Sequence, residues 1–305
     1  MTTNVRSNPL WSFSTAVAEL VETTEPSVVG VVAGRSLGSG VIWDAQGLIV
    51  TAAHVVRGET KAPLALGGGS QVEAKVVGAD RYADLALLKT DAPGLVPLSR
   101  GETREPAIGE FVLAMAARAG RRASATSGIV SGTARNVRVS WGSVLEDAVV
   151  TDARLNPGYS GGPLVDASGR LLGMNVAYIQ GRGVAIPAGA IEAFVRQTLK
   201  DGRVRRGYLG VAVEPIGLPA DVASQEGVGQ DGGLLVRTVE EGSPAKAAGL
   251  AIGDVILGFA GRRVEDEHGI HMALSAEAIG KAAPLKVLRG GKPSEYTVTP
   301  VEAGE

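Results

Sequence analysis

The sequence predicts a mainly β protein, in which two β-barrels are followed by a small α+β domain. Short apolar and β-branched runs, separated by glycine and polar turns, recur through residues 28–186 of the 305-residue chain. Glycine is abundant, at 43 residues, and aromatic residues make up only 4%. This composition favours many turns over a long helical bundle. Beyond residue 207 the pattern changes to strands mixed with short helices, so we expect a second domain there.

Each element of the first domain follows from a local pattern. Residues 1–13 are polar apart from Trp11 and Phe13, and we expect a loose arm there. Ser14 is expected to cap a short helix that ends before Pro26. Strands of the first barrel are predicted at 28–33, 38–43, 48–51, 72–77, 85–89 and 111–116. After a loop at 118–127, strands of the second barrel are predicted at 128–130, 137–139, 149–151, 163–165, 171–178 and 184–186.

The remaining elements lie on either side of a charged linker. A helix is expected at 190–199, with Gly202 placed to stop it. Residues 203–207 then separate a first domain at 27–202 from a second domain at 208–305, with the arm and short helix at 1–26. In the second domain we expect strands at 208–213, 234–239, 255–259, 285–288 and 296–298, and helices at 243–249 and 266–279.

Composition excludes several classes of partner and chemistry. The chain has 30 basic and 32 acidic residues, a net charge of −2, so no global field attracts nucleic acid or an anionic membrane. Arg118, Arg121 and Arg122 cluster, but without interleaved aromatic residues they do not indicate nucleic-acid binding. The absence of cysteine excludes disulfides, thiol nucleophiles and cysteine-ligated metals.

No part of the sequence predicts a membrane span. The first thirty residues contain no apolar run of signal-peptide length, and no segment approaches the roughly 20 apolar residues that a span needs. As written, the sequence indicates a cytoplasmic protein. A chain from which an export signal or anchor had been removed would look the same, so a periplasmic or other extracytoplasmic location stays open.

Residues 156–166, Asn-Pro-Gly-Tyr-Ser-Gly-Gly-Pro-Leu-Val-Asp, place Ser160 in a glycine-rich turn before an apolar strand. Glycine allows backbone torsions that are closed to other residues, so such a turn can expose a hydroxyl and nearby backbone N–H groups. Those N–H groups, from Gly158 and Ser160, would form an oxyanion hole. The alternative is a tight turn with no chemical role.

A serine nucleophile needs a base, and the candidates are few. His54 is the only histidine before residue 207, and it follows an apolar strand. Asp84 stands at the head of another strand and is a candidate for the carboxylate that orients the histidine. By composition alone, Asp80 and Asp91 are equally good candidates. A histidine that removes the serine proton needs a carboxylate to fix its tautomer and stabilise the imidazolium. His54, Asp84 and Ser160 occur in the chain order of chymotrypsin-like serine proteases.

The sequence resembles the HtrA/Deg family of serine proteases over nearly its whole length. In the first domain the matching segments are Gly-Ser-Gly-Val-Ile at 38–42, Thr-Ala-Ala-His-Val-Val at 51–56, Ala-Asp-Leu-Ala-Leu-Leu at 83–88, Thr-Ser-Gly-Ile-Val-Ser at 126–131, Thr-Asp-Ala at 151–153, Asn-Pro-Gly at 156–158 and Val-Ala-Ile-Pro at 184–187. In the second they are Arg-Gly-Tyr-Leu-Gly-Val at 206–211, Gly-Ser-Pro-Ala at 242–245, Ala-Gly-Leu at 248–250 and Gly-Asp-Val-Ile at 253–256.

The resemblance implies a chymotrypsin-like double β-barrel followed by one PDZ domain, without a cofactor. It implies a serine endopeptidase that cleaves unfolded or damaged proteins after small or medium aliphatic residues, with Leu155, Ala185 and Ile186 near the S1 pocket. It also implies a homotrimer, for which Trp11 and Phe13 are candidate contacts.

The PDZ resemblance implies that exposed C-termini bind as an added strand, with the terminal carboxylate held by Tyr208, Leu209, Gly210 and Val211. Ile270 and Leu274 either line this groove or belong to the core. His268 and His271 are expected to be solvated. Arg203, Arg205 and Arg206 are interpreted as a solvated linker, with carboxylate capture by Arg206 as the alternative.

The chain departs from the family pattern at two places. Tyr159 stands where the family usually has Asn, and Ala-Ala-Arg-Ala-Gly at 116–120 replaces the usual Gly-Asn-Pro-Phe-Gly. A catalytically idle peptide-binding or chaperone module is therefore the alternative to the enzyme. A metal hydrolase is disfavoured, because one histidine before the linker cannot make a usual histidine-rich zinc site.

Overall fold

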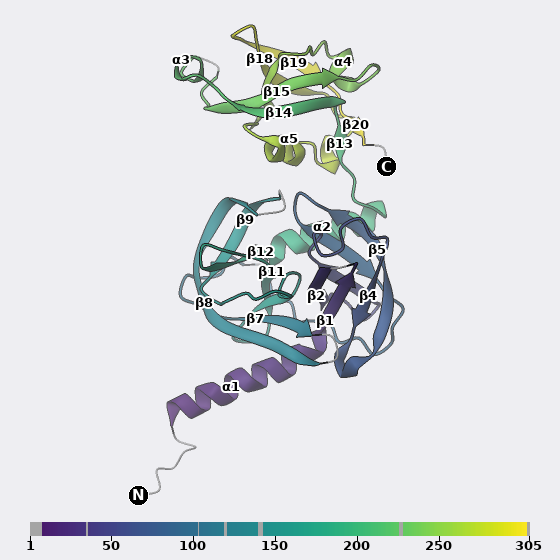
Figure 1. Ribbon diagram of the computed structural model, residues 1–305, viewed down its shortest axis with the longest axis vertical. Coiled ribbons are helices and arrows are strands. Elements are labelled where there is room, and N and C mark those ends of the chain that lie inside the picture. Colours follow the sequence, from purple (N-terminus) through teal and green to yellow (C-terminus); the bar gives the residue numbers. More distant parts are fainter. Residues whose placement is uncertain are drawn as a thin grey trace, which may run out of the picture. The chain divides into compact units, whose positions relative to one another are not determined.

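A computed structural model of the chain describes residues 8–34, 36–102, 104–118, 121–139, 143–225 and 228–303. The side chains of Arg118, Arg121 and Arg122 lie outside this description, so the predicted basic cluster is not assessed. The chain divides into two compact units, residues 1–203 and 204–305. The first unit contains two closed barrels and the second an open sheet (Figure 1). A mainly β fold, predicted from the sequence, is thus confirmed.

The first barrel closes in the order β1-β2-β3-β6-β5-β4. Its strands are β1 (Val28–Ala33), β2 (Ser36–Ile42), β3 (Leu48–Thr51), β4 (Lys61–Ala65), β5 (Gln71–Asp80) and β6 (Leu85–Lys89), with a 3-10 turn at Gly67–Gly69. The prediction missed β4, because Pro63 argues against a strand in the sequence. It also wrongly assigned residues 111–116 to this barrel. Pairing of β1 with both β2 and β4 closes the barrel without them.

The second barrel closes in the order β10-β11-β12-β9-β8-β7. Its strands are β7 (Phe111–Arg118), β8 (Arg121–Arg138), β9 (Val144–Thr151), β10 (Pro163–Asp166), β11 (Leu171–Ile179) and β12 (Arg182–Pro187). The predicted loop at 118–127 is wrong, because β7 and β8 pair along most of it. The two short strands predicted around residues 130 and 138 are one 18-residue strand. Gly132 lies at a register shift between β8 and β9. Because glycine is common in turns, the sequence predicted a break between two strands at this point.

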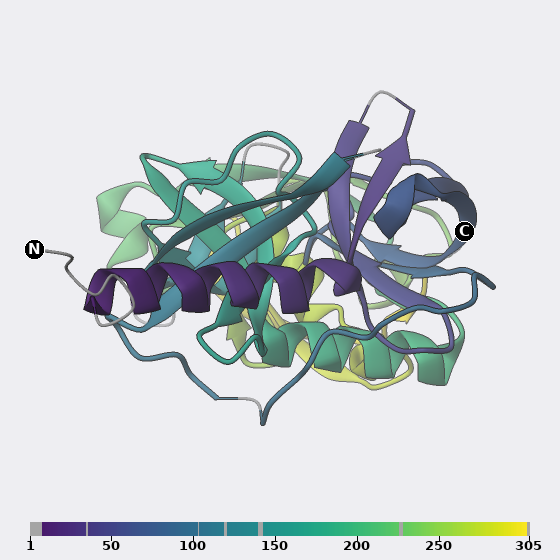
Figure 2. The same ribbon diagram turned by 90° about the horizontal axis from the view of Figure 1, so that it is seen from below.

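Two helices flank the barrels. Helix α1 (Pro9–Thr24) begins earlier than the predicted cap at Ser14, because the Asn8 side chain accepts a hydrogen bond from the Leu10 N–H and Pro9 occupies the first turn. Residues 9–13 are therefore helical rather than a loose arm. Figure 2 shows α1 crossing the underside of the second barrel, where Phe13 makes an edge-to-face contact with Phe111. A 3-10 turn (Glu25–Ser27) leads from α1 into β1.

Helix α2 (Ala188–Asp201) follows the second barrel. It ends at Gly202, which has a left-handed φ of 71°, as the sequence predicts. Among the helices of the described ranges, none is long and apolar enough to cross a membrane.

The second unit is built on a sheet in the order β14-β15-β16-β18-β19, with β17 also pairing with β16. These strands are β14 (Val211–Gly217), β15 (Gly232–Val239), β16 (Val255–Phe259), β17 (Arg262–Arg263), β18 (Ala283–Arg289) and β19 (Lys292–Val298). A separate pair joins β13 (Gly207–Tyr208) to β20 (Val301–Glu302). The helices are α3 (Ala220–Ala223), α4 (Pro244–Ala247) and α5 (Glu267–Ala273), with a 3-10 turn at Ala276–Ala278.

Several details of the second unit differ from expectation. The helix predicted at 266–279 is interrupted after Ala273, and only its first part is α-helical. His268 is buried on α5 rather than solvated. Arg205 is not simply solvated either, because its guanidinium donates two hydrogen bonds of 3.0 Å to the Glu302 carboxylate. Ile270 and Leu274 belong to the core, one of the two readings left open.

Candidate active site

The side chain of His54 is held by a buried carboxylate. Its Nδ1 lies 2.8 Å from Oδ2 and 3.0 Å from Oδ1 of Asp84, and the backbone N–H of His54 donates to Oδ1 at 2.9 Å. The Asp84 side chain is 1% exposed, whereas that of His54 is 19% exposed. A carboxylate in this position fixes which ring nitrogen carries the proton, and it leaves the other nitrogen of His54 to act as a base.

A sharp turn between β5 and β6 brings Asp84 to His54. Asp84 has a left-handed φ of 54°, a conformation that aspartate tolerates better than most residues. Asp80 stabilises the turn, since its Oδ1 accepts hydrogen bonds from the N–H groups of Tyr82 and Ala83. Asp91 is fully exposed and lies 3.9 Å from the Lys89 ammonium. Of the three acids left open by composition, Asp84 is therefore the one whose contacts fit an orienting role.

Ser160 lies in a tight loop between β9 and β10. Gly158 and Gly161 adopt left-handed φ values of 97° and 85°. A Cβ at Gly161 would lie 2.0 Å from the carbonyl oxygen of Ser39, so only glycine fits there. In this conformation the Ser160 hydroxyl donates a hydrogen bond of 2.8 Å to the carbonyl of Val176 on β11.

The loop packs directly against the segment that carries His54. Gly38 lies between the two, because a Cβ added to it would come within 2.6 Å of a methyl of Val55 and 2.9 Å of the Ser160 carbonyl oxygen. The N–H of Ser39 also donates to that carbonyl at 2.8 Å. The first barrel therefore supplies His54 and Asp84, the second barrel supplies Ser160, and the two barrels meet at the site.

Two peptide groups of the loop have fixed orientations. The carbonyl of Tyr159 accepts the N–H of Gly162 at 2.9 Å, and the carbonyl of Gly158 accepts the Ser39 hydroxyl at 2.7 Å. Because C=O and N–H point in opposite directions across a trans peptide, the first bond sets the direction of the Ser160 N–H. Within the described ranges, no hydrogen bond from the N–H of Gly158 or Ser160 is recorded. Both groups are thus compatible with the predicted oxyanion hole.

The residues predicted near the S1 pocket do not all lie together. Leu155 and Ala185 share one buried apolar cluster with Tyr159, whereas Ile186 belongs to a different cluster. The reason is the alternation of side chains along β12, which places Ala185 and Ile186 on opposite faces. Ile186 therefore lies away from the cluster that contains Leu155 and Ala185.

In the second unit, the predicted carboxylate loop runs between β13 and β14. The carbonyls of Leu209 and Gly210 accept hydrogen bonds of 2.9 Å from the N–H groups of Ala245 and Glu240. The N–H groups of Gly210 and Val211 consequently point the other way. Beside this loop, β14 is at the edge of the described sheet, with β15 on one side. Tyr208 sends its hydroxyl to Glu240, and this hydrogen bond raises the pKa of Tyr208 above its usual value.

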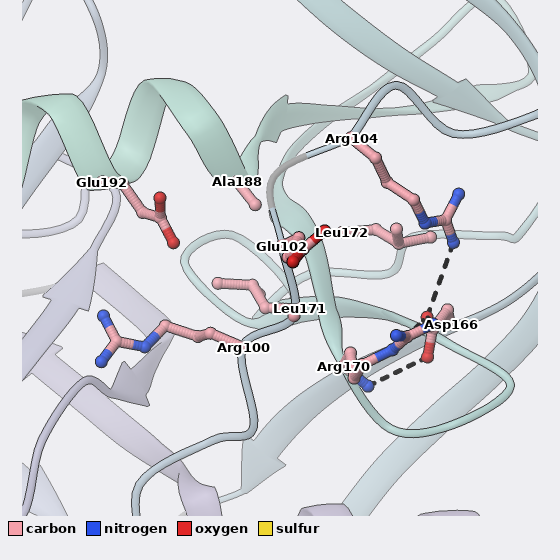
Figure 3. Close-up of a pocket in the computed structure, with 10 residues that line it drawn as sticks. Arg100, Glu102, Arg104, Asp166, Arg170, Leu171, Leu172, Ala188 and Glu192 are labelled. Carbon is pink, nitrogen blue, oxygen red and sulfur yellow. Dashed lines mark hydrogen bonds and ion pairs between the residues drawn. The ribbon is translucent and has the colours of Figure 1, made fainter.

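A second charged cluster surrounds Asp166, at the end of β10 (Figure 3). Its carboxylate accepts N–H groups of Ser168 and Arg170 and lies 2.9 and 3.6 Å from the guanidinium groups of Arg170 and Arg104. Although burial raises the pKa of Asp166, the hydrogen bonds from the N–H groups of Arg170 and Ser168 and from the Arg170 guanidinium outweigh it and hold the pKa below its usual value. Arg104 and Arg170 both pair with Asp166, and these ion pairs anchor the far end of the strand that follows Ser160.

Two residues around Ser160 went unnoticed as candidates in the sequence. Ser39 contacts the loop from β2, and Val176 accepts the serine hydroxyl from β11. The Gly-Ser-Gly segment at 38–40 was a usable signal for Ser39, whereas a backbone carbonyl such as that of Val176 leaves no mark in a sequence. Among the described residues, no three His, Cys, Asp or Glu gather as a metal site would require.

Comparisons with known proteins agree with this arrangement. Residues 38–174 match the trypsin-like peptidase domain, and residues 207–299 match the PDZ domain. The chain is 36% identical over 270 residues to a probable periplasmic serine endoprotease DegP-like of Chlamydia trachomatis, covering 86% of this chain and 53% of the relative. A protein of the same description from Halomonas elongata is 35% identical over 271 residues, with coverage of 87% and 56%. The chain thus spans about half the length of these curated relatives.

Solved structures match over almost their full length. The HtrA-type protease AlgW with a decapeptide superposes with a TM-score of 0.72 at 30% identity, covering 94% of this chain and 99% of that one. The serine endoprotease from Yersinia pestis gives a TM-score of 0.70 at 31% identity, with coverage of 94% and 98%. The chain therefore belongs to the HtrA family of serine endoproteases, with a trypsin-like peptidase domain followed by a PDZ domain.

Proposed function

We propose that the protein is a serine endopeptidase in which Ser160 is the nucleophile, His54 the general base and Asp84 the residue that orients His54. The observation that carries this proposal is the buried Asp84 carboxylate, which receives both the Nδ1 and the backbone N–H of His54. A buried carboxylate dedicated to one histidine, beside a serine on a glycine turn, fits acyl transfer better than a structural role.

The reaction begins when the Ser160 hydroxyl turns from the Val176 carbonyl towards His54. Its oxygen attacks the scissile carbonyl while His54 takes the proton, and Asp84 stabilises the imidazolium that forms. The N–H groups of Gly158 and Ser160 receive the oxyanion, each contributing roughly 3 kcal/mol to the transition state. His54 returns its proton to the leaving amine, and a water molecule then hydrolyses the acyl-enzyme by the same steps.

The substrate would bind as an added strand along β11. This strand pairs with β10 only as far as Met174, and Asn175 then bonds to Gly161 and Gly162 of the serine loop, so the backbone from Val176 to Tyr178 has β12 on one side alone among the described strands. Leu155 and Ala185 belong to a buried apolar cluster that also contains Tyr159 of the serine loop, which supports cleavage after small or medium aliphatic residues of unfolded proteins. Predominant cleavage after lysine or arginine in a peptide library would contradict this specificity.

The PDZ domain would bind exposed C-termini of substrates or effectors and regulate the protease. The free edge of β14 and the outward N–H groups of Gly210 and Val211 support this part of the proposal. An apolar C-terminal peptide should alter the rate of casein cleavage, and the same peptide with an amidated C-terminus should not.

The assembly and the location are proposed from the family. Trp11 and Phe13 on α1 are 54% and 56% exposed, which suits contacts in a homotrimer. Light scattering should give three times the chain mass, and Trp11→Ala should lower it. The relatives are named as periplasmic, so we propose an extracytoplasmic location; the cytoplasmic reading gains no support from them.

A fluorophosphonate probe tests the enzymatic function directly. The wild type should be labelled and should cleave casein, and Ser160→Ala should do neither while keeping its fold. A folded, unlabelled wild type would favour the idle peptide-binding module instead. The intact His54–Asp84 pair and the naming of the relatives as endoproteases argue against that alternative.

A further inference from the structure

Ser39 lies in β2, but two of its hydrogen bonds go to the loop that carries Ser160 and not to a neighbouring strand. It is fully buried, and its backbone N–H donates to the Ser160 carbonyl at 2.8 Å. Its hydroxyl donates to the Gly158 carbonyl at 2.7 Å and accepts the N–H of Ala117 at 3.0 Å. One side chain thus joins the first barrel, the last residues of β7 and the loop that carries the nucleophile.

The hydroxyl acts on the peptide group that determines the shape of the oxyanion hole. The N–H groups of Gly158 and Ser160 are separated by the Gly158–Tyr159 peptide. The orientation of this peptide decides whether the two N–H groups converge on one point. Glycine places little restriction on that orientation, since it crosses between regions of torsion space that other residues cannot enter. Two hydrogen bonds supply the restriction: the Tyr159 N–H donates to the Asn156 carbonyl at 3.1 Å, and the Gly158 carbonyl accepts the Ser39 hydroxyl at 2.7 Å.

The same hydroxyl links this peptide to the β7–β8 hairpin. A hydroxyl can donate and accept at once, and here it does both between two backbone groups. If Ala117 moved away, the Ser39 hydroxyl would lose one of its two partners, and its hold on Gly158 would weaken. Ser39 therefore provides a hydrogen-bonded link between the hairpin and the oxyanion loop, beside the direct packing of Gly162 on the Met115 carbonyl of β7.

We propose that Ser39 is a positioning residue, which holds the Gly158–Tyr159 peptide in the orientation that oxyanion binding needs and couples it to Ala117 of the hairpin. The inference rests on the proposed endopeptidase function. It assigns Ser39 no contact with the reacting atoms.

The test compares Ser39→Ala with Thr51→Val in the full chain. Thr51 also contacts Ser39, but through the Ser39 carbonyl, which accepts the Thr51 hydroxyl at 2.7 Å. Thr51→Val therefore removes a buried bond to the same residue without touching Gly158. We expect Ser39→Ala to lower kcat on a peptide substrate by about tenfold to a hundredfold, less than the loss of a direct donor. KM should stay within about threefold, the pH of half-maximal kcat should not move, and Thr51→Val should keep kcat within about threefold.

Hydrogen exchange gives a readout that does not depend on activity. Exchange in residues 156–162 should become faster in Ser39→Ala and stay as in the wild type in Thr51→Val. If Ser39→Ala fails to fold, Ser39→Cys takes its place in the test, because cysteine fills the same space with a weak donor. It should show the lower kcat and the faster exchange that are predicted for Ser39→Ala.

Three outcomes would overturn proposals here. Equal kcat and equal exchange in Ser39→Ala and the wild type would refute the role of Ser39 while leaving the protease intact. Parallel losses in Ser39→Ala and Thr51→Val would mean a merely structural contact. A wild type without labelling or cleavage would refute the proposed function, and exchange in residues 156–162 would still decide whether Ser39 positions the loop.

Discussion

Asp84 holds His54 by its ring and by its backbone at once, since one carboxylate receives both the Nδ1 and the main-chain N–H. The ring therefore cannot turn without leaving the carboxylate, and the backbone bond keeps the carboxylate in place. The orientation of His54 therefore depends on one buried residue, Asp84.

Asp84→Asn should keep the fold and lose activity. The amide oxygen can still accept the N–H of His54, which leaves the amide NH₂ facing Nδ1 and forces the proton onto the other ring nitrogen. His54 then cannot take the serine proton, and kcat should fall by about 10³- to 10⁴-fold in a peptide assay. Asp80→Asn, at the cap of the same turn, is the control and should stay active. Unchanged turnover in Asp84→Asn would assign the orienting role elsewhere.

Tyr159→Asn should destabilise the serine loop. Tyr159 is 4% exposed and lies in the apolar cluster with Leu155 and Ala185. Replacing its ring by an amide leaves space and a polar group in that cluster, at a cost of about 3 kcal/mol. The thermal midpoint should fall by about 6 °C or more, and labelling by the fluorophosphonate should slow. Tyr159→Phe, which keeps the ring, should stay closer to the wild type in both. Equal midpoints for Tyr159→Asn and the wild type would show that the ring does not anchor the loop.

Gly210→Ala should weaken peptide binding by the PDZ domain. Gly210 has a left-handed φ of 78°, and a Cβ there would lie 2.2 Å from the Cβ of Ser243. The loop must shift to relieve this clash, so the outward N–H groups lose their alignment. We expect the affinity for an apolar C-terminal peptide, measured by calorimetry, to fall at least about tenfold. Gly217→Ala, at a glycine of β14 where an added Cβ would make only an ordinary contact of 4.0 Å with the Asp231 carbonyl oxygen, is the control. Loss of affinity in both variants alike would contradict a specific role for the loop.

Asp254 should make the stability of the second unit depend on pH. It is 1% exposed, and its carboxylate lies 2.7 Å from two nitrogens of Arg289 and 2.8 Å from the Ala251 N–H. Burial raises the pKa of Asp254, but the hydrogen bonds from Arg289 and Ala251 outweigh it and lower the pKa below its value in the unfolded chain. Its stabilisation is therefore complete above the unfolded pKa and is lost as the pH falls through the lower, folded value.

The corresponding variant is Asp254→Asn, measured by urea unfolding of the full chain. At pH 7 it should be less stable than the wild type by about 2 kcal/mol, the scale of a charged hydrogen-bonded pair. The difference should shrink as the pH is lowered below 4, because the wild-type carboxylate becomes protonated as well. A difference that stays constant from pH 7 to pH 3 would attribute the loss to packing instead of charge.

The sequence predicted those parts of the fold that depend on local pattern. Gly202 ends α2 as expected because a left-handed helix cap needs glycine. The triad candidates could be named because few residue types perform that chemistry, and only one histidine precedes the linker. The choice of Asp84 over Asp80 came from the family resemblance. Composition does not separate the two residues, because what distinguishes them is the direction in which the turn points each carboxylate.

The failures share a physical cause, which is the dependence of an element on partners distant in the sequence. Strand β4 forms despite Pro63 because β1 and β5 pair on either side of it. Ser39 looks like any small residue in a strand until Gly158 and Ala117 are brought to it. The burial of His268 likewise follows from the packing of α5, and no pattern within the helix shows it.

On the mechanism that we propose for Ser160 and His54, the division of the site between the barrels determines when the chain can react. His54 and Asp84 precede the second barrel in the sequence, and Ser160 follows only after the first three of the six strands of that barrel. A chain emerging from the ribosome, or one with a single barrel folded, carries either a base without a nucleophile or a nucleophile without a base. The protein would thus be harmless to itself and to its neighbours until both barrels have closed and docked.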